Sequence, residues 1–72
     1  MTDTPFARVL RAELDRKGWS SAELARRADM PAPTVWRYLQ GKQEPGFMAA
    51  RALVRALGRS LAWLDRQLGD AA

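Results

Sequence analysis

The stretch SSAELARRADMPAPTVWRYLQ, residues 20–40, holds the signals that decide the fold. Ser20 followed by Glu23 has the spacing of a capping box, in which each side chain accepts a hydrogen bond from the other residue's backbone N–H. Trp19 before the cap and Leu24 after it have the spacing of a hydrophobic staple. Together these signals mark the start of a helix.

This pattern predicts a helix over residues 21–28, a proline-containing break, and a second helix that ends at Gly41. Pro33 fits the first turn of a helix but disfavours helical backbone at Ala32, so the second helix starts somewhere within residues 31–33. Apolar residues at helical spacing predict its buried face: Val35, Tyr38 and Leu39. The opposite stripe contains Ala32, Pro33, Trp36, Arg37 and Gln40.

Helical periodicity predicts three further helices and no strand. One covers residues 5–17 and ends at Gly18, with an apolar face of Phe6, Val9, Leu10 and Leu14. Another ends at Gly58, with an apolar face of Phe47, Ala50, Leu53, Val54 and Leu57. Ser60 caps the last, which presents Leu61, Leu64 and Leu68. We therefore expect residues 1–72 to form one compact five-helix, all-α domain with its core over about 5–68.

The composition excludes several classes of function. The 72 residues include no cysteine and no histidine, so disulfides, thiolate nucleophiles and the commonest general base are all missing. A zinc site would need carboxylates alone. We expect no enzymatic activity, no metal, no cofactor and no small-molecule substrate. No segment has the length or hydropathy of a membrane span or a signal peptide, so a cytoplasmic location is expected.

The net charge of +4 is unevenly distributed. Residues 31–59 contain five basic side chains against Glu44 alone, and so carry the whole +4, while the two flanking segments nearly cancel. A basic middle segment in a small chain points to an acidic partner, most simply nucleic acid. A solvated, arginine-rich face is the alternative, and the arginines at 26, 27, 51, 55 and 59 are interpreted in that way.

From Phe6 to Leu64 the sequence resembles the Cro/CI-type (XRE-type) helix-turn-helix domains of phage repressors and small bacterial regulators. The matching fragments keep the family's spacing without an insertion: Lys17-Gly18-Trp19-Ser20, Glu23-Leu24-Ala25, Val35, Gly41-Lys42, Pro45, Ala56-Leu57-Gly58, Ser60-Leu61 and Trp63-Leu64. The resemblance implies a lambda-repressor-like fold whose helix-turn-helix spans residues 20–40.

The same resemblance implies binding of double-stranded DNA, with a recognition helix over about 32–40 in the major groove. Phosphate contacts are expected from Ser21, Lys42 and Gln43. Base-facing positions are Ala32, Pro33, Trp36 and Arg37, and further hydrogen bonds are available from Thr34 and Gln40. Arg37 is also compatible with a phosphate contact, and Trp36 with packing on DNA, on a protein partner or back onto the domain.

Three departures from the family pattern carry consequences. Asp29 stands where the turn usually has Gly, and Asp tolerates positive φ better than most residues. Leu14 and Leu39 replace a frequent ion pair, so we expect these two side chains to touch. The recognition stripe has few groups that read bases, so DNA shape should contribute to sequence preference.

The resulting hypothesis is a sequence-specific transcriptional regulator, most simply a repressor, that binds a palindromic operator as a homodimer. The family's dimer contact maps to Leu61, Trp63 and Leu64. The alternative is an antitoxin or adaptor that uses the same domain mainly to hold a protein partner. The resemblance also implies a bacterial or phage-encoded, nucleoid-associated protein.

Overall fold

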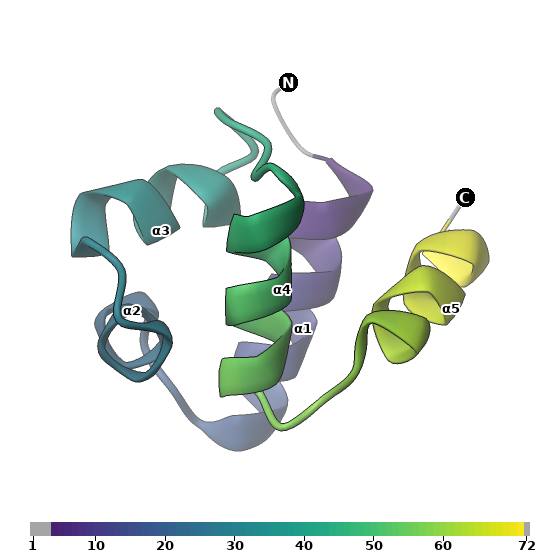
Figure 1. The fold of residues 1–72 in the computed structure, drawn as a ribbon, viewed down its shortest axis with the longest axis horizontal. Helices are drawn as coiled ribbons and strands as arrows, with labels where there is room; N and C mark the ends of the chain where they lie inside the picture. The colour runs from purple at the N-terminus through teal and green to yellow at the C-terminus, as the bar shows by residue number, and fades with distance from the viewer. Residues whose placement is uncertain (1–3, 72) are drawn as a thin grey trace.

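The computed structural model describes residues 4–71, with side chains described to residue 69, and this part of the chain consists of helices joined by turns and loops, without a strand. Its five helices are α1 (Pro5–Lys17), α2 (Ser21–Ala28), α3 (Ala32–Leu39), α4 (Phe47–Ala56) and α5 (Leu61–Ala71). α4 lies in front of α1, α2 and α3 flank this pair on one side, and α5 flanks it on the other (Figure 1). The predicted all-α, five-helix architecture is confirmed.

The helix starts follow the capping signals in the sequence. The Oγ of Ser20 accepts a hydrogen bond of 3.1 Å from the backbone N–H of Glu23, which fixes the start of α2. Thr4 caps α1 in the same way through the N–H of Ala7. Side-chain caps of this kind satisfy N–H groups that have no partner inside the helix, so local sequence determines where these helices begin.

Several helices end at or next to a residue in the left-handed backbone conformation. Gly18 and Gly58 have φ values of 70° and 75°, a region that costs glycine little. Asp29 ends α2 at φ 56° and is the one non-glycine residue with positive φ in the described chain. This conformation is the one that the sequence predicts for the turn of the helix-turn-helix.

The start of α3, left open within residues 31–33, falls at Ala32. Pro31 is the N-cap with φ −61° and ψ 135°, and its carbonyl accepts hydrogen bonds from the N–H groups of Thr34 and Val35. Pro33 therefore stands in the first turn, where a missing N–H removes no helical hydrogen bond. The helix begins one residue before Pro33 without disruption.

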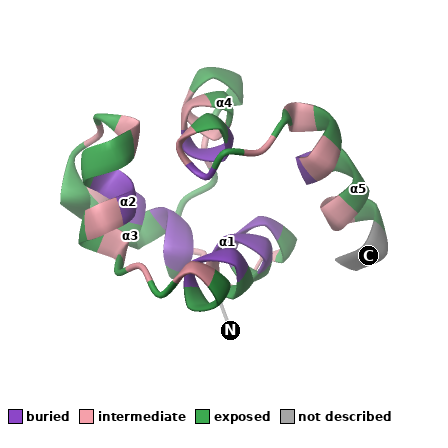
Figure 2. Cartoon of the chain, turned by 90° about the horizontal axis from the view of Figure 1, so that it is seen from below, coloured by how far each residue is buried: buried purple, intermediate pink, exposed green. Residues whose placement is uncertain are grey.

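One hydrophobic core joins all five helices, and its buried residues face the centre of the molecule (Figure 2). α2 packs against both α3 and α4, and α5 packs mainly against α1. Leu14 and Leu39 belong to the same core cluster, as expected, although their direct contact stays a prediction. The core holds α3 in place through the side chains that the pattern predicts: Val35, Tyr38 and Leu39.

Two expectations about single side chains were wrong. Phe47 is expected on the buried face of α4, but it is 67% exposed, and the residues of this helix that are fully buried are Leu53 and Val54. Arg59 was interpreted as solvated, but its Nε donates a hydrogen bond of 2.8 Å to Glu13. Glu13 is the one buried charged side chain among those described.

No helix in the described part of the chain is long and apolar enough to cross a membrane.

Candidate nucleic-acid interface

The candidate interface is the outer face of α3, and the core residues of this helix fix its direction. Because Val35, Tyr38 and Leu39 are buried, the remaining positions of α3 point outward. The residues of the expected outer stripe are all exposed, namely Ala32, Pro33, Trp36, Arg37 and Gln40. The sequence therefore predicted correctly which stripe of α3 is exposed, whereas the DNA contacts of this stripe stay a prediction.

Arg37 lies at the centre of a polar cluster on this face. Its Nε donates a hydrogen bond of 3.2 Å to the Oε1 of Gln43, and its Nη2 lies 3.5 Å from the Oγ1 of Thr34. Both partners are neutral, so neither of them offsets the positive charge of Arg37. The cluster joins α3 to the loop after it and brings together three residues that the sequence assigned to DNA.

Trp36 is half-exposed, at 46%, and does not fold back into the core. The Nζ of Lys42 lies 5.0 Å from the centroid of its indole ring, within the range of a cation–π interaction. The loop thus places its ammonium group beside α3. Aromatic and basic groups together suit contact with the sugars and phosphates of a nucleic acid backbone.

The basic side chains on this face differ from those of α2 and the end of α1 in how they are paired. Arg26 and Arg27 form ion pairs with Glu23, and Arg16 pairs with Glu13. Each of these arginines has a carboxylate partner that offsets part of its charge. Arg26 and Arg27 are two of the residues interpreted from the sequence as solvated. Within the described residues neither Arg37 nor Lys42 forms an ion pair, so their charge is available to phosphates.

Ser21, the remaining expected phosphate contact, is the first residue of α2 and is half-buried. The neighbouring Ser20 uses its hydroxyl for the cap, whereas the hydroxyl of Ser21 is not part of this cap. A helix N-terminus offers free N–H groups and a partial positive charge to an anion. Glu23 in the same turn opposes this, but its two arginine partners offset its charge and hold the pKa of its carboxyl below the usual value.

The structure contains a second basic feature that the sequence alone does not reveal. Arg51, Arg55 and Arg59 line a shallow depression of about 320 Å³ at the turn from α4 to α5, together with Ser60 and Leu61. Arg51 and Arg55 are exposed and form no ion pair within the described residues. Their spacing of four residues was visible in the sequence, but the turn that closes the depression was not.

The expected dimer residues on α5 lie in different environments. Leu64 is only 6% exposed and packs in the core of its own chain, so it offers little surface to a second copy. Leu61 and Trp63 are partly buried, and the guanidinium of Arg59 lies 5.1 Å from the Trp63 ring centroid. A dimer contact on this helix would therefore involve Leu61 and Trp63 more than Leu64.

The described residues contain no cluster of three or more potential metal ligands.

Two helices joined by a short turn, the second presenting an exposed polar and basic face, define a helix-turn-helix. A sequence profile for the family described as "Helix-turn-helix domain" matches residues 5–67. The chain belongs to this family of XRE-like helix-turn-helix domains. Searches of curated proteins and of solved structures gave no significant match. Membership of the family indicates a DNA-binding regulator.

Proposed function

We propose that the protein is a sequence-specific transcriptional repressor that binds double-stranded DNA with α3 in the major groove. The observation that carries this proposal is the group of Arg37, Thr34 and Gln43 on the exposed face, beside Lys42. The guanidinium of Arg37 can donate two hydrogen bonds to the O6 and N7 atoms of a guanine. Cytoplasmic location and the absence of enzymatic activity are part of the same proposal.

The proposed contacts divide into two kinds. Lys42, Gln43 and the start of α2 at Ser21 would hold phosphates on either side of the groove and set the position of the domain. Arg37 would read a base, with Gln40 and Thr34 as further hydrogen-bonding groups. Ala32 and Pro33 offer only apolar contact to thymine methyl groups, so DNA shape would add to the preference.

A homodimer on a palindromic operator completes the proposal. Two recognition helices related by a two-fold axis would read half-sites about 34 Å apart. Leu61 and Trp63 on α5 are the partly buried apolar residues that support a contact on that side. Sedimentation at micromolar concentration, with and without operator DNA, should show the dimer. A monomer under both conditions would contradict it.

The direct test of DNA binding is a titration with the DNA upstream of the protein's own gene, repeated at several salt concentrations. Neutralising Z phosphates gives a log–log slope of affinity against salt near −0.9Z. We expect a steep slope together with tighter binding than to an unrelated duplex of the same length. Equal affinity for both duplexes would show that the protein does not bind DNA in a sequence-specific way.

A second candidate function, an antitoxin or adaptor that holds a protein, is supported by a different observation. Trp36, Phe47 and Met48 are large apolar side chains that are 46%, 67% and 67% exposed. Aromatic residues in this state are typical anchors of protein interfaces. Replacing Phe47 and Met48 with Ser should leave operator binding intact if their role is in protein binding, and weaken it if they contact DNA.

A further inference from the structure

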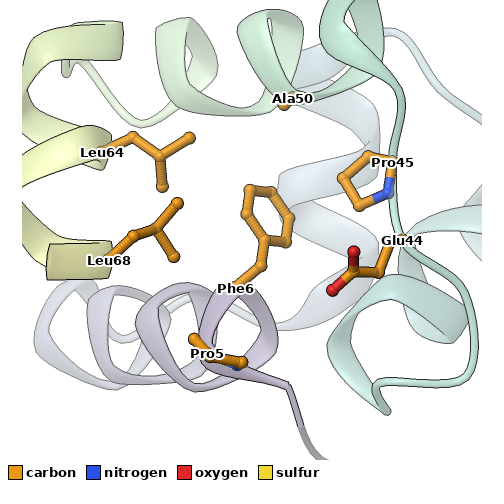
Figure 3. Close-up of a pocket in the computed structure, with 7 residues that line it drawn as sticks. All are labelled: Pro5, Phe6, Glu44, Pro45, Ala50, Leu64 and Leu68. Atoms are coloured by element: carbon orange, nitrogen blue, oxygen red, sulfur yellow. The ribbon is translucent and has the colours of Figure 1, made fainter. Parts of the chain in front are cut away.

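A groove on the side of the domain has the size and lining of a small-ligand site. Its volume is about 410 Å³, within the range of about 300–1,000 Å³ typical of such sites. Four parts of the fold line it, namely the start of α1, the loop before α4, α4 itself and α5 (Figure 3). The lining residues are Pro5, Phe6, Glu44, Pro45, Ala50, Leu64 and Leu68.

The lining is apolar except at one position. The ring of Phe6 stands between the two leucines of α5 and the loop residues Glu44 and Pro45 (Figure 3). Ala50, on the face of α4 that turns inward, is too small to fill the space above this ring. Apolar walls with one charged group are the usual design of a site that binds an amphiphilic molecule in one orientation.

Glu44 supplies the charged group. The side chain of Glu44 points into the groove (Figure 3). Its carboxylate forms no ion pair within the described residues. Among the described residues, no basic side chain lines the groove. An ionised carboxylate only accepts hydrogen bonds, so its complement is a cationic donor such as an ammonium group.

We propose that this groove binds a small apolar ammonium compound, with its ring or chain against the partly exposed Pro45 and Leu68, above the buried Phe6 and Leu64, and its ammonium group on Glu44. The groove is open to solvent, and its single carboxylate among otherwise apolar lining residues favours a small cationic ligand. A second copy of the chain would need a broader surface. This binding is independent of the function proposed above.

The position of Glu44 gives such a ligand an effect on DNA, and this step rests on the proposed function. Glu44 is the one acidic residue within 31–59 and follows Gln43, which holds Arg37 by a hydrogen bond. A bound ammonium would neutralise a carboxylate that otherwise repels phosphates at this loop. The ligand should therefore tighten DNA binding, and by linkage DNA should tighten ligand binding by the same factor.

The test uses three probes that share one aromatic ring: benzylammonium, benzyl alcohol and phenylacetate. Methyl resonances of Leu64 and Leu68 are followed by NMR during titration of the DNA-free protein. We expect benzylammonium to give saturable shifts. Benzyl alcohol should bind more weakly, and phenylacetate should not bind. Glu44→Gln should lower the affinity for benzylammonium about threefold, which is the typical contribution of one exposed ion pair. The control Asp65→Asn removes an exposed carboxylate elsewhere and should change nothing.

A second variant tests the groove itself. Ala50→Leu fills the space and should abolish the shifts, with thermal unfolding used to show that the variant stays folded. The proposal is overturned if no probe gives saturable shifts, if the alcohol binds as well as benzylammonium, or if the same resonances depend on protein concentration without ligand. The last result would assign the groove to a second copy.

The effect on DNA is measured by repeating the operator titration with benzylammonium at saturation. We expect about threefold tighter binding, and no effect of the ligand in Glu44→Gln. An unchanged affinity overturns the coupling. If the protein binds no duplex at all, the proposed function fails, whereas the NMR titration still decides whether the groove binds the ligand.

Discussion

Glu13 of α1 accepts a hydrogen bond of 2.8 Å from the Nε of Arg59, a residue 46 positions later in the turn between α4 and α5. Arg16 adds two more hydrogen bonds to the same carboxylate, at 3.2 and 2.8 Å. The buried carboxylate thus ties the first helix to the last part of the chain. The contact of Arg59 with the Trp63 ring extends the connection into α5.

Glu13→Gln should lower the free energy of unfolding by about 1–3 kcal/mol, the usual cost of losing hydrogen bonds to a buried charged group. The variant keeps the volume of the side chain, so no cavity contributes to the loss. Urea denaturation at neutral pH measures the change. Asp65→Asn is the matched control and should stay within about 0.5 kcal/mol of the wild type. Equal stability of Glu13→Gln and the wild type would show that the ion network does not stabilise the fold.

The stability contributed by Glu13 should depend on pH. Hydrogen bonds from Arg16 first, and from Arg59, hold the pKa of its carboxyl below the ordinary value of 4.5, against the opposing effect of burial. Because the unfolded chain takes up this proton at a higher pH than the folded chain, acid favours unfolding. The contribution is complete above the ordinary pKa and is lost as the pH falls through the lowered one.

The measurement is the difference in unfolding free energy between the wild type and Glu13→Gln along an acid titration. This difference should be largest at neutral pH and should shrink on acidification below the ordinary pKa. Comparing the two proteins cancels the contributions of the other carboxylates. A difference that stays constant through the acid range would mean that the charge of Glu13 is not the source of its effect.

Ser20→Ala should destabilise the protein by about 1 kcal/mol, the typical effect of losing an N-cap. The N–H of Glu23 would lose its partner at the start of a helix of only eight residues. Ser21→Ala, one residue further along, keeps the cap and should have little effect on thermal stability. If both serines gave the same loss, the cap would not be what fixes the start of α2.

Asp29 should be replaceable by Gly without loss of stability, because its φ of 56° lies in the region that glycine adopts freely. Asp29→Val should lose about 1–2 kcal/mol, since a side chain in the left-handed region strains the backbone. Urea denaturation measures the unfolding free energies of both variants and shows which one is more stable. A valine variant as stable as the glycine variant would contradict the conformation of this turn.

Features encoded within a few neighbouring residues were predictable from the sequence. The start of α2 follows from Ser20 and Glu23, which lie three residues apart, and its end follows from the turn at Asp29. The exposed stripe of α3 follows from the helical spacing of Val35 and Leu39. These signals are local, so one sequence was enough to locate the helices and the candidate interface.

Features that depend on distant residues were not predictable in the same way. Nothing near Glu13 indicates that Arg59 will reach it, and the periodicity of α4 marks a face without showing that Phe47 lies beyond the core. The hydrogen bond from Arg37 to Gln43 depends on the path of the loop after α3. The groove depends on the packing of α5 against α1, which periodicity does not determine.

The measurement that tests the central claim most directly compares Arg37→Ala with Lys42→Ala on operator DNA and on an unrelated duplex. Arg37→Ala should reduce operator affinity by about 1–3 kcal/mol and relax the sequence preference. Lys42→Ala should weaken binding to both duplexes alike and should reduce the log–log slope of affinity against salt by about one. If neither substitution changes binding to the operator, α3 does not lie in the major groove and the proposed function is wrong.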